Sequence, residues 1–176
     1  MPAPLTVLVT AVGCPGTTAL VRALREHGER PVRVVGTDMQ REVWGAFACD
    51  GFALVPAGSD PGFADALLDV ALREGASVVI PQTSYDLPGL AAARDRFAAA
   101  GVRALVPSAA DVRRADSKRE TLAVCARLGV RHPAFIEAQG GEAVLAAARA
   151  RLPGRRRLHE ARHGRRLARL PRRPCH

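Results

Sequence analysis

With 176 residues, 48% hydrophobic and 4% aromatic, the chain has room for one ordinary domain and part of another, with a core of Ala, Val and Leu. The net charge of +9 lies entirely in residues 151–176, which hold ten Arg and one acid, so the rest of the chain is neutral. Four cysteines without paired spacing exclude a disulfide framework and favour a cytoplasmic protein, and the apolar run 5–12 is too short to span a membrane.

Strands and helices alternate along the first two thirds of the chain. A continuous β-branched run predicts a buried strand at 5–12, and further strands are predicted at 32–37, 51–56, 77–80 and 102–106. Apolar residues at helical spacing predict helices at 19–28, 63–74 and 87–100, with a short helical turn at 43–48. This alternation predicts right-handed crossovers and an open parallel sheet of the α/β class.

A further helix is predicted from Ser117, which is a good N-cap with Glu120 at the capping-box spacing, to Gly129, a typical helix end. Lys118, the single lysine, lies in the first turn, where the helix dipole disfavours a cation that has no anionic partner. It is therefore either a ligand contact or an ordinary solvated lysine. Residues 134–136 and 142–149 predict the first strand and helix of another unit.

Ligands bind at the carboxyl ends of parallel strands, so the loops that follow the strands carry the candidate substrate-binding residues. These are Gly13, Gly16, Asp38, Gln82 and Thr83. A Gly13-x-x-Gly16 turn with Asp38 after the second strand also suits a dinucleotide, although Thr17 and Thr18 replace the end of the full glycine fingerprint. The remaining alternative is a plain tight turn of an α/β sheet.

The Arg-rich segment 151–176 is predicted to be irregular and disordered. Its alternatives are a basic arm that binds nucleic acid non-specifically, or translation of GC-rich DNA in a shifted frame. His159–His163 matches the HExxH zinc pattern, but Gly164 and neighbouring arginines argue for a chance match, so no metal site is predicted.

Several segments in order resemble the N-terminal region of ATP-grasp ligases, close to proteins like the carbamoyl-phosphate synthase large subunit. The resemblance covers about residues 5–136, and the matching segments are Val7–Gly13, Val34–Met39, Cys49–Pro56, Leu87–Phe97, Ser117–Thr121 and Leu128–Pro133.

The resemblance implies a Rossmann-like pre-ATP-grasp domain at 1–115, the start of an ATP-grasp domain at 116–150, and the irregular tail at 151–176. It also implies ATP and Mg²⁺ as cofactors, a small carboxylate or amine substrate, and Lys118 as a nucleotide contact. The carboxylate would be activated as an acyl phosphate and then attacked by an amine. Because the acidic and Asn metal ligands of the family lie beyond this chain, we expect no catalytic or metal-binding residue in it, and no tight cofactor binding or activity by it alone.

Two other classes of function stay open from the sequence. An NAD(P)- or nucleotide-binding oxidoreductase would depend on Gly13 and Asp38. A nucleic-acid-binding module would depend on residues 151–176 and would bind with a steep salt dependence.

Overall fold

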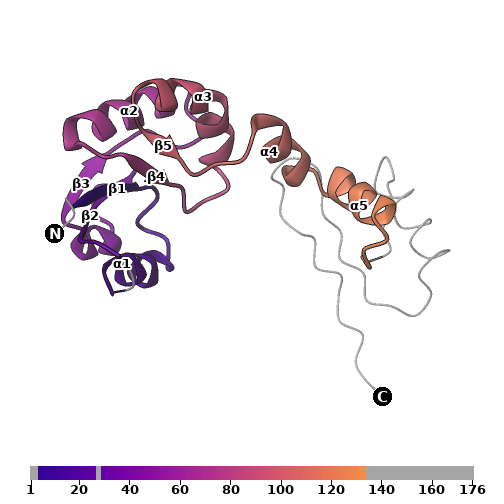
Figure 1. The fold of residues 1–176 in the computed structure, drawn as a ribbon, viewed down its shortest axis with the longest axis horizontal. Helices are drawn as coiled ribbons and strands as arrows, with labels where there is room; N and C mark the ends of the chain where they lie inside the picture. Colours follow the sequence, from indigo (N-terminus) through magenta and orange to yellow (C-terminus); the bar gives the residue numbers. More distant parts are fainter. Residues whose placement is uncertain (1–3, 27–28, 134–176) are drawn as a thin grey trace, which may run out of the picture. The chain divides into compact units, whose positions relative to one another are not determined.

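A computed structural model of the chain describes residues 4–26 and 29–133 (Figure 1). Its centre is a five-stranded, entirely parallel sheet in the order β3-β2-β1-β4-β5. The strands are β1 (Leu5–Val9), β2 (Val32–Asp38), β3 (Gly51–Leu54), β4 (Val78–Ile80) and β5 (Arg103–Ala104). The predicted open parallel α/β sheet is confirmed.

Helices cover both faces of this sheet: α1 (Thr17–Glu26) lies on one face, and α2 (Phe63–Glu74) and α3 (Leu87–Ala99) lie on the other (Figure 1). Side chains of β1 alternate between the two layers, as the pleat requires. Val7 and Val9 pack in the cluster that contains Val21 of α1, whereas Leu8 packs with Leu67 and Phe97 of the opposite layer. The central strands are therefore buried on both sides, which is why their sequences are continuous apolar runs.

Strand β1 is shorter than the predicted strand at 5–12, because the backbone changes partners at its carboxyl end. After Val9, the N–H of Thr10 donates to Ile80 at 3.1 Å and the N–H of Val12 donates to Thr37 at 3.1 Å. Ala11 between them has a φ of 49°. The chain thus crosses from the β4 side of β1 to the β2 side within three residues, which ends the regular ladder. The short helical turn predicted at 43–48 is confirmed as η1 (Trp44–Ala48).

No helix was predicted between the strand at 102–106 and the helix that begins after Ser117, but the structure has one there, α4 (Ala109–Asp116). The hydroxyl of Ser108 accepts a hydrogen bond from the N–H of Asp111 at 3.2 Å and caps its first turn. Val112 of α4 is buried in the same core layer as α3. Ser108 and Asp111 have the spacing of an N-cap signature, so the sequence did contain the signal for this helix.

Helix α5 (Lys118–Arg127) begins after Ser117, as predicted. The Ser117 hydroxyl accepts from the N–H of Glu120 at 3.3 Å, while the N–H of Ser117 donates to the carbonyl of Arg113 at 3.3 Å. The N-cap is confirmed. The N–H of Ser117 is bonded to the last turn of α4, however, so it is not the partner of the Glu120 side chain that a capping box would require. Gly129, with a φ of 67°, adopts the expected left-handed conformation after the helix.

The chain divides into two compact units, Met1–Thr121 and Leu122–His176. Within the second unit the structure describes only Leu122–Pro133. The elements predicted at 134–136 and 142–149, the Arg-rich segment 151–176 and the HExxH match all lie outside the described residues. In the described part of the chain, no helix is long and apolar enough to cross a membrane.

Candidate functional site

The sheet has its topological switch point between β1 and β4, because β2 and β3 extend the sheet on one side of β1 and β4 and β5 on the other. At such a point the loops leaving neighbouring strands turn to opposite faces, which opens a crevice beyond their carboxyl ends. Residues 10–17, after β1, and 81–86, after β4, form these loops. The candidate site is built from their side chains.

Thr10 joins the two loops. Its side chain is 1% exposed, and its hydroxyl donates to Asp86 Oδ2 at 2.5 Å. The same hydroxyl oxygen accepts the backbone N–H of Gln82 at 3.3 Å. One buried hydroxyl therefore holds both ends of the segment between β4 and α3 against the end of β1.

The Gln82 side chain bridges the loop after β4 and the segment after β1. Its Nε2 donates to the carbonyl of Thr10 at 3.2 Å and to the hydroxyl of Thr17 at 2.9 Å. Thr17, fully buried at the start of α1, donates its own hydroxyl proton to the carbonyl of Val12 at 2.8 Å. These bonds use both amide hydrogens and leave Oε1 of Gln82 as an acceptor beside Gly16, where a Cβ would lie 3.7 Å away.

Asp38 fixes the turn after β1 from the end of β2. It is 9% exposed, and its Oδ2 accepts the N–H of Gly13 at 2.9 Å. Its Oδ1 accepts the N–H of Gln40 at 3.0 Å. The structure thus brings Gly13 and Asp38 together, and it uses the amide and both carboxylate oxygens to hold two loops in place.

Asp86 is a site residue that the sequence analysis missed. It is 4% exposed, and its pKa is raised by burial and also by the nearby Asp38 carboxylate, while the Thr10 hydrogen bond acts in the opposite direction. Gly58 packs so close that a Cβ there would lie 2.3 Å from Oδ1 of Asp86. The position just before α3 suggests an ordinary N-cap, but Asp86 makes no side-chain capping bond.

Thr10 was missed as well, because it continues an apolar strand run. Thr83, by contrast, was predicted, and it stabilises the turn after β4: its hydroxyl accepts the N–H of Tyr85 at 3.3 Å. Lys118 is the exposed first residue of α5 and takes no part in the hydrogen bonds that join the loops after β1, β2 and β4. Within residues 4–26 and 29–133, no group of three or more His, Cys, Asp or Glu side chains could hold a metal ion.

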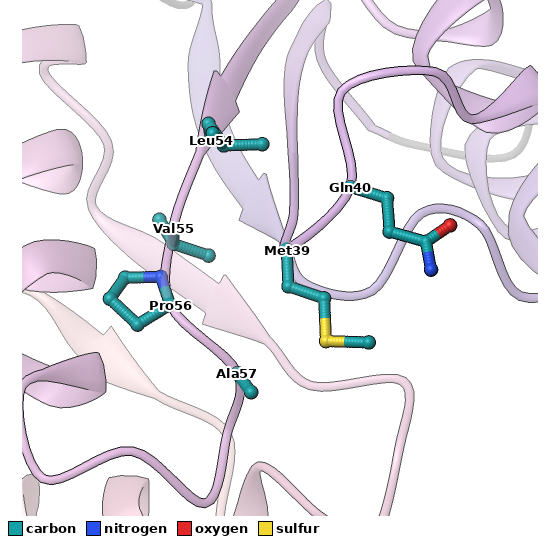
Figure 2. A pocket seen from close by; sticks show the side chains of 6 residues that line it. All are labelled: Met39, Gln40, Leu54, Val55, Pro56 and Ala57. Atoms are coloured by element: carbon teal, nitrogen blue, oxygen red, sulfur yellow. The ribbon is translucent and has the colours of Figure 1, made fainter.

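An open apolar depression of about 520 Å³ lies beyond the carboxyl ends of β2 and β3 (Figure 2). Figure 2 shows that two of its lining residues follow β2, while the others come from the end of β3 and the loop after it. The lining residues are Met39, Gln40, Leu54, Val55, Pro56 and Ala57.

The fold belongs to the Rossmann-like α/β class, and solved structures share it. The fold is similar to glycinamide-RNase-transformylase T from Mycobacterium tuberculosis (20% identity, TM-score 0.55), over 74% of this chain and 38% of that one. It is also similar to the biotin carboxylase domain of a single-chain bacterial carboxylase (21% identity, TM-score 0.56), over 83% of this chain and 34% of that one.

The PylC-like, N-terminal domain family matches residues 7–105, which is more than half of the chain. The chain belongs to this family. No curated protein matches the sequence. The expected resemblance to the N-terminal, pre-ATP-grasp region of ATP-grasp ligases is therefore confirmed.

Proposed function

We propose that this chain forms the acceptor-substrate side of an ATP-dependent ligase that joins a carboxylate to an amine, with chemistry like that of carbamoyl-phosphate synthase. The observation that carries the proposal is the set of hydrogen bonds that joins the loops after β1 and β4 at the switch point of the sheet. There, Oε1 of Gln82 is held as an acceptor beside Gly16, because both of its amide hydrogens are already bonded. An amine or hydroxyl of a small substrate is the complementary group.

In this reaction the carboxylate oxygen attacks the terminal phosphorus of ATP and releases ADP, and the amine then displaces phosphate from the acyl phosphate. Bound ATP would supply the phosphoryl group, and Mg²⁺ would neutralise the charge of its phosphates. Lys118 suits the nucleotide side, since an ammonium at a helix N-terminus is complementary to phosphate oxygens. Gln82, Gly16 and Thr83 would orient the acceptor, and Asp38 would hold the Gly13 turn that forms one wall.

A dinucleotide-dependent oxidoreductase is less consistent with this geometry. That function needs the Gly13 amide for a phosphate and the Asp38 carboxylate for a ribose hydroxyl. Here the Gly13 amide donates to Asp38 itself, and the second Asp38 oxygen accepts from Gln40. Both groups would have to break existing bonds to bind the cofactor. A nucleic-acid role would rest on residues outside the described part of the chain.

We also place the protein in the cytoplasm. Among the described residues, the thiols of Cys14, Cys49 and Cys125 are free. Burial raises the pKa of the Cys49 thiol, against the opposing effect of Arg25, so this thiol is held in its unreactive protonated form. Free thiols are the usual state in a reducing compartment.

The proposal is tested by ligand-observed NMR of the full 176-residue chain against a panel of small carboxylic acids and amines. We expect at least one amine-bearing compound to bind and to lose at least fivefold in affinity in Gln82→Leu. The matched control Leu72→Ala, on the exposed side of α2, should bind normally. Absence of any such binder contradicts the proposed acceptor site. ATP turnover by the chain alone would contradict the assignment of the chain to the acceptor side only.

A further inference from the structure

The turn before α2, residues 57–62, covers one oxygen of the buried Asp86 carboxyl group; we call it the Gly58 turn. A Cβ on Gly58 would lie 2.3 Å from Oδ1 of Asp86 and 2.8 Å from the carbonyl oxygen of Tyr85. The α-hydrogen that takes the place of this Cβ therefore points at the carboxyl oxygen. A Cα–H group is a much weaker donor than an N–H or O–H group. Oδ1 of Asp86 is thus covered by backbone that satisfies it poorly.

The opposite oxygen of Asp86 has one strong donor. Oδ2 accepts the hydroxyl of Thr10 at 2.5 Å, and no other residue that the structure describes donates a hydrogen bond to this carboxyl group. Because Asp86 is 4% exposed, water has little access to it. An ionised carboxylate offers about four acceptor positions and is costly to bury with a single donor. The observed packing therefore suits the protonated, neutral carboxyl group.

The charges around Asp86 also disfavour its ionised form. In the described part of the chain, the carboxylate of Asp38 at the end of β2 is the one charged group that acts on it. Burial raises the pKa of Asp86, and Asp38 raises it further, against the opposing effect of the hydrogen bond. The nearest other titratable side chains are Asp60, which accepts an amide of its own turn, and Tyr85, which is 77% exposed. No cation therefore offsets a negative charge at Asp86.

The Gly58 turn can move as a unit, because its hydrogen bonds are internal. The N–H of Asp60 donates to the carbonyl of Ala57 at 2.8 Å, and the N–H of Gly62 donates to Oδ1 of Asp60 at 2.7 Å. Among the residues that the structure describes, no hydrogen bond joins the turn to residues 81–89, in the loop after β4 and the start of α3. Separating the two segments therefore breaks packing contacts but no hydrogen bond.

We propose that the Gly58 turn is a pH-sensitive cover, closed over the protonated carboxyl group of Asp86 and separating from it when the group loses its proton to the solvent. Separation lets water reach Oδ1 of the carboxylate. Ionisation also strengthens the hydrogen bond from Thr10, because charge-assisted hydrogen bonds are stronger than neutral ones. The loop after β4 therefore stays attached to the end of β1 while the turn moves. This device depends on packing and charge alone and does not require the proposed ligase function.

The proposal is tested by NMR of the full chain, labelled with ¹³C and ¹⁵N, between pH 4 and pH 9. We expect the carboxyl ¹³C signal of Asp86 to titrate above the ordinary pKa of 3.8, and the amide signal of Gly58 to shift with the same midpoint. A neutral, soluble paramagnetic agent should broaden the Gly58 amide at least twofold more above that midpoint than below it. Its effect on the Gln82 amide, which is bonded to Thr10, should not change.

Four variants separate the contributions, and the amide spectrum of each reports whether it is folded. Asp86→Asn keeps the shape but cannot ionise, so Gly58 should stay shielded at every pH. Asp38→Asn removes the neighbouring charge and should lower the midpoint of Asp86. Asp60→Asn removes the titrating group of the turn itself and should leave that midpoint unchanged. Asp69→Asn, at an exposed position on α2, is the matched control and should change neither signal.

Three results would each overturn the inference: an Asp86 signal that titrates at the ordinary value, a Gly58 amide that stays shielded when Asp86 ionises, or the native pH response in Asp86→Asn. An equal change at the Gln82 amide would also contradict it, because the whole edge of the sheet would then open. Gly58→Ala is a second test, since its Cβ does not fit under the closed turn. In this variant the amide of the substituted residue should be exposed at every pH, and shielding of it in the folded protein would contradict the packing.

Discussion

Replacing Thr10 with Val tests whether one buried hydroxyl holds the loops after β1 and β4 together. The two side chains have nearly the same shape, so the substitution leaves no large cavity. It removes the donor to Asp86 and the acceptor of the Gln82 amide, while both of those groups stay where they are. Asp86 is 4% exposed, so water cannot freely replace the lost hydroxyl.

The expected cost follows from these two bonds. A hydrogen bond to a charged group contributes about 1.5–3 kcal/mol, and a buried N–H left without a partner costs about 1–3 kcal/mol. Because local relaxation will recover part of this, we expect Thr10→Val to lower the free energy of unfolding by about 3 kcal/mol. Thr6→Val, in the strand β1 that leads to Thr10, is the matched control; Thr6 is less buried than Thr10, and its substitution should cost about 0.5 kcal/mol.

Urea unfolding is followed by the fluorescence of Trp44, the single tryptophan of the chain. Combining Thr10→Val with Asp86→Asn should show a coupling energy of about 1 kcal/mol or more, since the two side chains are directly bonded. If Thr10→Val costs no more than Thr6→Val, the Thr10 hydroxyl does not organise the site and the reasoning fails.

Three further predictions concern pH and packing. Burial in the folded protein raises the pKa of Asp86, so its carboxyl group contributes most to stability below its ordinary pKa of 3.8. That contribution is lost as the pH rises through the pKa of the folded state. The stability of Asp86→Asn, measured by urea midpoints, should therefore rise relative to that of the native chain from pH 4 to pH 8. The hydrogen bond from Arg33 holds the pKa of Glu74 below its ordinary value of 4.5, so this ion pair stabilises the fold above that pH and its contribution is lost on acidification. In the same assay, Glu74→Gln should cost only about 0.5 kcal/mol at pH 7 and less at pH 3. A Cβ on Gly45 would lie 1.7 Å from the carbonyl oxygen of Val12, so Gly45→Ala should lower the free energy of unfolding by about 3 kcal/mol or more in thermal unfolding. Gly51→Ala is the control: its Cβ would lie 3.4 Å from the nearest atom, and the free energy of unfolding should change by about 0.5 kcal/mol. Equal effects of the two substitutions would contradict the packing at Gly45.

Some residues of the candidate site could be predicted from their position in the sequence alone. Gly13, Gly16, Asp38, Gln82 and Thr83 were found because each follows a predicted strand of a parallel sheet, where ligand loops are expected. What each residue does there was not predictable. The bond between Asp38 and the Gly13 amide joins residues 25 apart, and it turns an expected ligand contact into a structural one.

Asp86 and Thr10 show the same limit more strongly, since they are 76 residues apart in the chain. Thr10 is part of an apolar run, and Asp86 has the sequence position of a helix cap. No local pattern pairs them, because their meeting depends on β4 lying next to β1. The missed helix α4 is different, because its cap signal at Ser108 was present in the local sequence.

The sequence by itself determined the order and type of the elements, the two buried faces of the central strands, and the left-handed turn at Gly129. These depend on local periodicity and backbone conformation, which neighbouring residues specify. Only the tertiary structure decided the strand order, the switch point between β1 and β4, and the hydrogen bonds that join the loops there. The physical reason is that the spacing of apolar residues along a strand indicates which of its faces are buried. Which strands pair with each other depends instead on the free energy of the whole packed sheet.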